Sequence, residues 1–200
     1  MLNFQTAKSA FRLLHNSRCG LYMHEYQAYD LLKKYQLNLV PVTIPLNQGY
    51  RATTPEDAFS ISQRMMANVS KNKPFVDIVI KAQVHAGGRG KGYFKESGLK
   101  GGVQIATKAE EVKEYCDKML GKTLITHQTG SIGKRCNEVF LVEKIYLRKE
   151  LYLSLTLDRS RGMMAVITSE KGGVNIEDVE ASKMHKFFFE LGEDIPLDVL

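Results

Sequence analysis

A glycine-rich segment at residues 87–92 carries the residue types best suited to chemistry in this chain. It sets Arg89 and Lys91 among four glycines, which are Gly87, Gly88, Gly90 and Gly92. Backbone amides without a neighbouring Cβ atom can approach anionic oxygens closely, and the two cations add favourable charge. The segment is therefore predicted to bind phosphate, with an ordinary surface turn as the alternative.

Neither of the two common glycine-rich phosphate motifs is present. No glycine falls three residues after Gly90, as a dinucleotide fingerprint requires, and Lys91 is followed by Gly92 rather than by Ser or Thr. Residues 71–100 nevertheless hold seven basic side chains against two acidic ones. This concentration of positive charge favours a polyphosphate ligand over a plain turn.

The segment just before the glycines predicts a strand over residues 76–82. Apolar Val76, Ile78 and Ile80 alternate with residues that include Lys81, which is the period-2 pattern of a half-buried strand. Lys81 is therefore expected to project from the face opposite the apolar one, next to the glycine-rich segment.

Glu143 and Glu150 form a second candidate group, with Tyr146 between them. Glu143 lies at the end of one predicted strand and Glu150 at the start of the next, so the two bracket a turn and could hold the sugar and base of a nucleotide. The alternative is a solvated hairpin end with surface ion pairs. His85 is expected to be a polar loop residue or a phosphate contact, and the five histidines show no spacing typical of a catalytic triad.

The elements that must position these residues are predicted from periodicity and capping signals. Helices are expected at residues 24–35, 54–68 and 107–120, the last one capped by Thr107 and Glu110. A strand is expected at 102–106, followed by an antiparallel meander at 122–127, 138–145, 150–157 and 163–168. In the third strand of the meander, four leucines are expected to face a core: Leu151, Leu153, Leu155 and Leu157.

Composition and charge narrow the function classes. The chain has 200 residues, 44% of them hydrophobic and 25% charged. No run approaches the length that a membrane-spanning helix needs, so an integral membrane protein is excluded. The formal charge is +6, but residues 1–24 contain three basic residues and no acid. The remainder carries only +3 (25 basic minus 22 acidic), which disfavours a nucleic-acid partner.

Residues 1–22 are typical of a mitochondrial presequence, because basic, hydroxyl and apolar residues mix without an acid or a long apolar core. An amphipathic helix of the folded domain, or a frayed tail, is the alternative. Cys116 and Cys136 show no metal-ligand spacing and are expected to be reduced structural thiols, with Cys116 on the buried stripe of a predicted helix.

Several segments, in order, resemble the beta subunit of succinyl-CoA synthetase (succinate-CoA ligase), an ATP-grasp family. They are HEYQAYDLLKKY, VIKAQVHAGGRGKG, SGLKGGV, FLVEKIYLRKELYLSLTLDRS and KGGVNIEDVE, and the resemblance covers about residues 22–180. It implies an α+β ATP-grasp fold, with a mixed sheet and helices plus the antiparallel meander, and with the nucleotide between two lobes. The domain would run over residues 23–200 and be incomplete at its C-terminus.

The resemblance also implies roles for individual residues. Lys81 would contact the phosphates of ATP, and Gly88, Arg89 and Gly90 would close over them. Glu143 and the hinge to Tyr146 would meet the adenine. Glu150 would lie on the ribose side. The Mg²⁺ ligands of the family would lie beyond Leu200, and the CoA-ligase domain would be absent from this chain.

The implied reaction is that of the citric acid cycle enzyme, in which ATP, succinate and CoA give succinyl-CoA, ADP and phosphate. The alpha subunit would be the partner and would carry the phosphohistidine, and the location would be the mitochondrial matrix. ATP is favoured over GTP by the same resemblance. This chain alone is expected to be inactive. A truncated, non-catalytic ATP-binding or assembly paralogue, or another ATP-grasp carboxylate ligase, remains an alternative.

Overall fold

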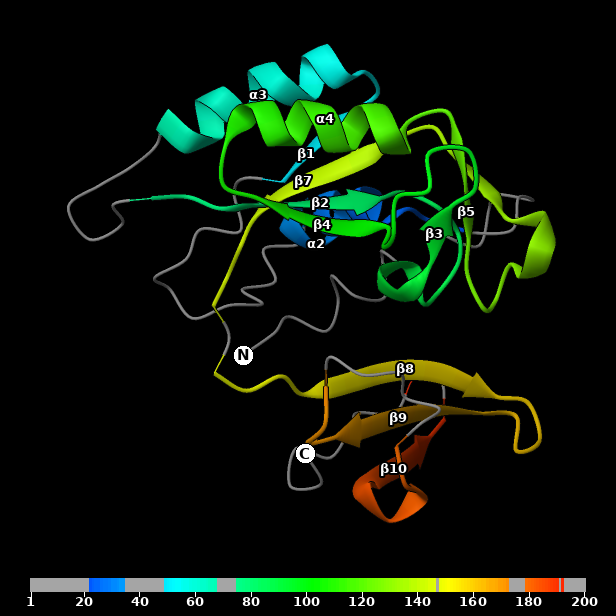
Figure 1. Ribbon diagram of the computed structural model, residues 1–200. Helices are drawn as coiled ribbons and strands as arrows, with labels where there is room; N and C mark the ends of the chain where they lie inside the picture. The colour runs from blue at the N-terminus through cyan, green and yellow to red at the C-terminus, as the bar shows by residue number, and fades with distance from the viewer. Residues whose placement is uncertain are drawn as a thin grey trace. The chain divides into compact units, whose positions relative to one another are not determined.

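The computed structural model describes residues 22–34, 49–67, 75–146, 148–172, 179–190 and 192. All of the expected presequence except Tyr22 therefore lies outside the described residues. The chain divides into two compact units, Met1–Lys144 and Ile145–Leu200, and each is described by itself (Figure 1).

A four-stranded sheet forms the centre of the first unit. Its strand order is β1-β7-β2-β4, and these strands span Tyr50–Ala52, Val139–Glu143, Ile78–Ala82 and Val103–Ala106. All of these strand pairs are antiparallel, so the described sheet is not the mixed sheet that was expected. Lys81 on β2 pairs with Val103 on one side and with Phe140 on the other. Because directly paired residues share a face, these three side chains lie on the same face of the sheet.

Two helices, α3 (Pro55–Ala67) and α4 (Ala109–Met119), cover one face of this sheet (Figure 1). Helix α3 begins as expected, because the Thr54 hydroxyl accepts a hydrogen bond from the Asp57 amide at 3.1 Å. At α4 the expected cap is wrong: Glu111, and not Glu110, accepts hydrogen bonds from the amides of Thr107 and Lys108. The apolar core lies between these helices and β2, and Cys116 is buried in it as expected, together with Cys136.

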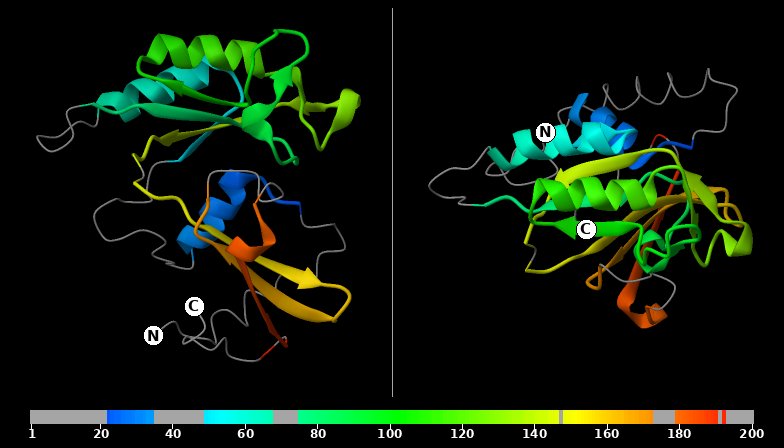
Figure 2. Two further views of the ribbon diagram at one scale, coloured as in Figure 1. Left: turned by 60° about the horizontal axis from the view of Figure 1, so that its bottom comes forward. Right: turned by 45° about the horizontal axis from the view of Figure 1, so that its top comes forward.

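Helix α2 (Glu25–Lys34) packs on the opposite face of the sheet. Two of its tyrosines contact Phe140, with ring centroids 6.4 Å away for Tyr26 and 5.6 Å away for Tyr29. Since Phe140 shares a face with Lys81, the first turn of α2 lies on the side of the sheet from which Lys81 projects. Figure 2 shows this helix in two further views.

A small sheet supports the glycine-rich segment. Its strand order is β3-β5-β6, and these strands span Tyr93–Phe94, Lys122–Ile125 and Lys134–Cys136. The segment itself forms a short 3-10 turn, η1, over Arg89–Lys91. A second 3-10 turn, η2, covers Gly130–Ile132.

The second unit contains a three-stranded sheet in the order β10-β9-β8, built from Met184–Phe189, Met163–Ser169 and Tyr152–Asp158, with a 3-10 turn, η4, at Ala181–Lys183. The expected continuous meander is wrong, because β5, β7 and β8 belong to three different sheets. The four leucines of the β8 segment alternate as predicted but do not face a core among the described residues. Their exposed fractions are 66% for Leu151, 71% for Leu153, 61% for Leu155 and 53% for Leu157.

No helix in the described part of the chain has the length and apolar character needed to cross a membrane.

Candidate functional site

Lys81 projects from β2 away from the apolar core, as its alternation predicted. Its neighbours Ile80 and Ala82 are completely buried on the other face, whereas the Lys81 side chain is 28% exposed. The Nζ atom donates a hydrogen bond to Oε1 of Glu25 at 2.6 Å. An ammonium group therefore lies beside the glycine-rich segment, already paired with one carboxylate.

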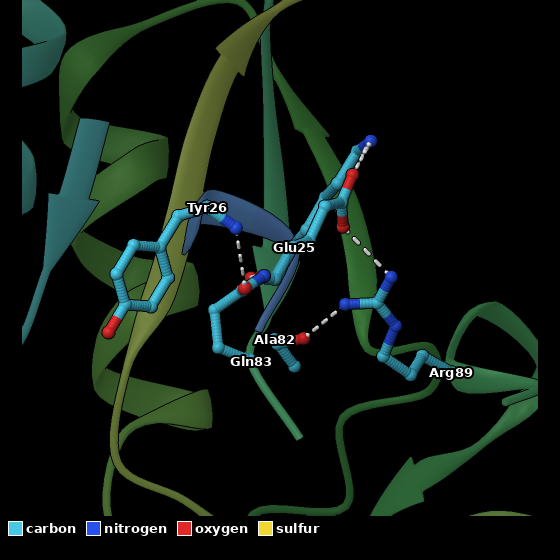
Figure 3. A network of polar contacts seen from close by, with 6 residues as sticks. Glu25, Tyr26, Ala82, Gln83 and Arg89 are labelled. Carbon is cyan, nitrogen blue, oxygen red and sulfur yellow. Dashed lines mark hydrogen bonds and ion pairs between the residues drawn. The ribbon is translucent and has the colours of Figure 1, made fainter. Parts of the chain in front are cut away.

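Arg89 meets the same carboxylate from the glycine-rich segment (Figure 3). Its Nη2 atom donates to Oε2 of Glu25 at 2.9 Å, and its Nη1 atom donates to the carbonyl oxygen of Ala82 at 2.7 Å. One carboxylate thus bridges two cations, one from the strand and one from the loop. Two positive charges against one negative charge leave this cluster with a formal excess of one.

Glu25 is charged at neutral pH in this environment. Burial of the carboxylate acts to raise its pKa, but the hydrogen bonds and charges of Lys81 and Arg89 outweigh burial and lower the pKa below its usual value. Its side chain is still 31% exposed, so water reaches the cluster. The three side chains therefore form a charged group at the rim of the sheet and not a buried ion pair.

Gln83 fixes the first turn of α2 to the end of β2. Its side chain is buried, its Oε1 atom accepts from the Tyr26 amide at 3.4 Å, and its Nε2 atom donates to the carbonyl of Lys81 at 3.1 Å (Figure 3). These contacts place Glu25, the first residue of the helix, directly over Lys81.

The glycine-rich loop has two parts: an open crest at Gly88 and Gly90, and a tightly packed base at the Arg89 carbonyl and Gly92. Gly88 has a φ of +69°, in the left-handed region that favours glycine, and a Cβ atom at Gly88 or Gly90 would meet nothing within 4 Å. At the base, the carbonyl of Arg89 accepts from the Gly102 amide at 2.7 Å. A Cβ atom at Gly92 would lie 2.4 Å from the carbonyl oxygen of Ile125. The loop is thus anchored to its surroundings while its crest stays accessible to a ligand.

A groove of about 570 Å³ runs beside the loop. Its lining includes Gly90, Lys91, Lys100 and Val103, and none of the described residues that line it is acidic. Val103, the strand partner of Lys81, lines this groove together with its neighbour Gln104, whereas Lys81 and Arg89 are not among the lining residues. Its positive lining and open backbone suit an extended anion such as a polyphosphate chain.

His85 precedes the loop and stacks on His24, with ring centroids 3.9 Å apart and ring planes inclined by 15°. Burial, followed by the neighbouring charge of His85, lowers the pKa of His24, against an opposing contribution from Glu138. The carbonyl of His85 accepts a hydrogen bond from the Lys134 ammonium at 2.7 Å. The described contacts of His85 are those of a polar loop residue.

The other predicted nucleotide contacts are distributed over both units. Glu143 ends β7 in the first unit, whereas Tyr146, 63% exposed, and Glu150 belong to the second. Since β7 and β8 lie in different sheets, the two glutamates do not bracket a hairpin, and this part of both interpretations is wrong. Their contacts to adenine and ribose remain predictions.

The sequence pattern around Glu25 does not predict its place in this cluster. Glu25 lies 56 residues before Lys81, and an acid in the first turn of a helix is ordinarily explained by the helix dipole. The two cations that it joins were both singled out, but nothing in the local sequence pattern relates them to this carboxylate.

The described residues do not fit a magnesium site. They contain no group of three or more His, Cys, Asp or Glu side chains that could hold a metal ion. Glu25, the acid paired with Arg89 of the loop, is engaged by two cations, which disfavour a third.

A family model described as the ATP-grasp domain matches residues 22–193. Among curated proteins, the chain is 42% identical over 193 residues to the mitochondrial beta subunit of the ADP-forming succinate-CoA ligase of Dictyostelium discoideum, covering 96% of this chain and 38% of that protein. It is 41% identical over 180 residues to the mitochondrial beta subunit of the ADP-forming succinate-CoA ligase of Columba livia, covering 90% of this chain and 38% of that protein. The hydrogenosomal beta subunit of the same ligase from Neocallimastix frontalis is 43% identical over 159 residues, covering 80% of this chain and 33% of that protein.

Among solved structures, the chain resembles ATP citrate lyase from Methanothrix soehngenii, which was solved in complex with citrate and coenzyme A. The TM-score is 0.58 at 20% identity, over 89% of this chain and 36% of the other. This likeness concerns the fold alone. In these comparisons the chain spans less than two fifths of the length of each relative.

Proposed function

The chain belongs to the ATP-grasp family, and from this premise we propose that Lys81, Arg89 and the glycines on either side of Arg89 bind the phosphates of ATP. The observation that carries the proposal is the convergence of Lys81 and Arg89 on a single anion beside an open, glycine-lined groove. Gly88 and Gly90 would contribute backbone amides at the crest of the loop. Glu143 and Tyr146 are proposed to contact the adenine, and Glu150 the ribose.

The chemistry of phosphoryl transfer explains why such residues suffice at this position. The reaction needs little covalent help from the protein, but it needs a positioned phosphate chain and neutralisation of its charge. A lysine on a rigid strand supplies a fixed charge, and an amide-rich loop supplies hydrogen-bond donors that can adapt to the ligand. Mg²⁺ is proposed to accompany ATP, held by groups other than the described residues of this chain.

We further propose that the chain is the nucleotide-binding part of a beta subunit of ADP-forming succinate-CoA ligase. The curated relatives named above carry that name, and they match most of this chain. The whole reaction would then convert succinate, CoA and ATP to succinyl-CoA, ADP and phosphate, with an alpha subunit as partner. Residues 1–22 are proposed to direct it to the mitochondrial matrix, ahead of an ATP-grasp domain over 23–200, because two of these relatives are named as mitochondrial.

The first prediction tests the phosphate site with Lys81→Ala. Because Lys81 lies outside the apolar core, the variant is expected to fold, while the dissociation constant for ATP rises by roughly ten- to a hundredfold through loss of a charged contact. Isothermal titration calorimetry measures the affinity for ATP and, in parallel, for GTP, which is expected to bind more weakly.

Lys118→Ala is the matched control, since it also removes one ammonium group paired to a glutamate, but on the exposed side of α4. Its affinity for ATP is expected to equal that of the wild type. Unchanged affinity in Lys81→Ala, with the fold confirmed by circular dichroism, would remove Lys81 from the site.

A further inference from the structure

We propose that Glu25 is an internal anion that occupies the two phosphate-binding cations in the absence of nucleotide and is displaced by ATP, so that it sets the affinity of the site. The inference rests on the proposed ATP site at Lys81 and Arg89. It adds a residue from α2 to that site and makes nucleotide binding an exchange of one anion for another.

The two cations hold one anionic group between them. Glu25 presents two oxygens from one carbon atom, much as a phosphoryl group presents oxygens from one phosphorus atom. One oxygen accepts from the Lys81 ammonium at 2.6 Å and the other from the Arg89 guanidinium at 2.9 Å. Two cations arranged around a carboxylate in this way are also arranged to receive a phosphate.

Arg89 donates two hydrogen bonds, and only one of them can pass from its present acceptor to a phosphate oxygen. Its Nη1 atom donates to the carbonyl of Ala82, which is fixed within the strand. Its Nη2 atom donates to a side chain that is 31% exposed at the first residue of a helix. Phosphate can therefore take the Nη2 donor while the Ala82 contact keeps the guanidinium in place. Because the Glu25 side chain is already partly exposed, it can turn toward solvent by rotation about its own bonds.

The charge difference between the two anions gives the exchange its direction. A carboxylate carries one negative charge, whereas the phosphate chain of ATP carries several, so ATP gains more from two cations than Glu25 loses. A free carboxylate has no such advantage over Glu25. The internal anion thus selects against singly charged anions and weakens the binding of ATP by a fixed amount.

The second prediction is that Glu25→Gln binds ATP more tightly than the wild type. Glutamine keeps the length of the side chain and removes its charge, so the competitor is lost and the formal charge of the cluster rises from one to two. The dissociation constant for ATP is expected to fall by roughly tenfold, as for one unit charge removed at several ångströms from the ligand. The measurement is isothermal titration calorimetry on the full chain.

Glu114→Gln is the matched control. It removes one glutamate charge and one ion pair, with Lys118, from α4 on the other face of the sheet. Its affinity for ATP is expected to remain that of the wild type. A gain seen in both variants would mean that net charge alone is responsible, and it would overturn the proposal.

A second measurement uses the wild type and needs no variant. If ATP displaces Glu25, the first turn of α2 loses a tether, and amide hydrogen exchange over residues 25–30 is expected to become faster at saturating ATP. Slower or unchanged exchange there would overturn the proposal, as would unchanged or weaker binding by Glu25→Gln. Failure of the wild type to bind ATP would instead refute the proposed function itself.

Discussion

Two glycines of one loop can be assigned different roles from the space around them. A Cβ atom at Gly90 meets nothing within 4 Å, whereas one at Gly92 would lie 2.4 Å from the carbonyl oxygen of Ile125. Backbone cannot move aside as a flexible side chain can, so Gly92 is required by packing. Gly90 has no such constraint, and its missing side chain leaves room for a ligand at the crest of the loop.

The third prediction separates these roles with two alanine variants. Gly92→Ala is expected to lower the free energy of unfolding by roughly 1–3 kcal/mol, as overpacking does. Gly90→Ala is expected to unfold with the wild-type midpoint in urea but to bind ATP more weakly, because its methyl group narrows the approach to the amides. Equal stability of the two variants would contradict the packing argument, and wild-type ATP affinity in Gly90→Ala would contradict the binding argument.

Single residues could be predicted from the sequence where their role depends on near neighbours. The alternation of apolar residues along β2 was sufficient to predict that Lys81 projects away from the core. The apolar stripe of α4 was sufficient to predict that Cys116 is buried. Glu25 could not be predicted, because its partners are 56 and 64 residues away in the chain. Only the folded sheet brings the first turn of α2 over Lys81.

Helices followed the predictions closely, and sheets did so only in part. A helix begins and ends on local signals, such as the Thr54 cap of α3, and the structure has α3 at Pro55–Ala67 where residues 54–68 were expected. Strand pairing depends on distant partners. The strand β7 follows β6 in the chain but inserts between β1 and β2, so a meander inferred from consecutive strands assigns it to the wrong sheet.

The leucines of β8 give the fourth prediction. Leu153 and Leu155 are 71% and 61% exposed, so Leu155→Ser is expected to change the free energy of unfolding by less than about 1 kcal/mol, where a core leucine would cost roughly 2–5 kcal/mol on truncation. The comparison variant is Val166→Ala on the paired strand. Because Val166 is only 5% exposed, this substitution is expected to lower the free energy of unfolding. Urea denaturation measures both variants, and a larger loss in Leu155→Ser would show that the leucine face is covered in solution.

The described residues of the two units differ in how much apolar surface they bury. The large core cluster belongs entirely to the first unit and is built around fully buried residues such as Ile78, Ile80 and Leu141. In the second unit, the described residues with comparable burial are Ala165, Val166, Ser169 and Val179. Because burial of apolar surface is the main source of folding free energy, the first unit is expected to be the more stable of the two.

The fifth prediction compares amide hydrogen exchange in two strands that each lie at the centre of a sheet. Both β2 and β9 are central, since each pairs with a strand on both sides, so backbone hydrogen bonding alone would protect them alike. Burial differs, and β9 is therefore expected to exchange its amide hydrogens through local opening, at rates roughly a hundredfold or more above those of β2. Hydrogen exchange followed by mass spectrometry resolves the two strands. Equal protection of the two strands would mean that the sheet of the second unit draws stability from a source other than its own buried side chains. Faster exchange in β2 would reverse the assigned order of stability.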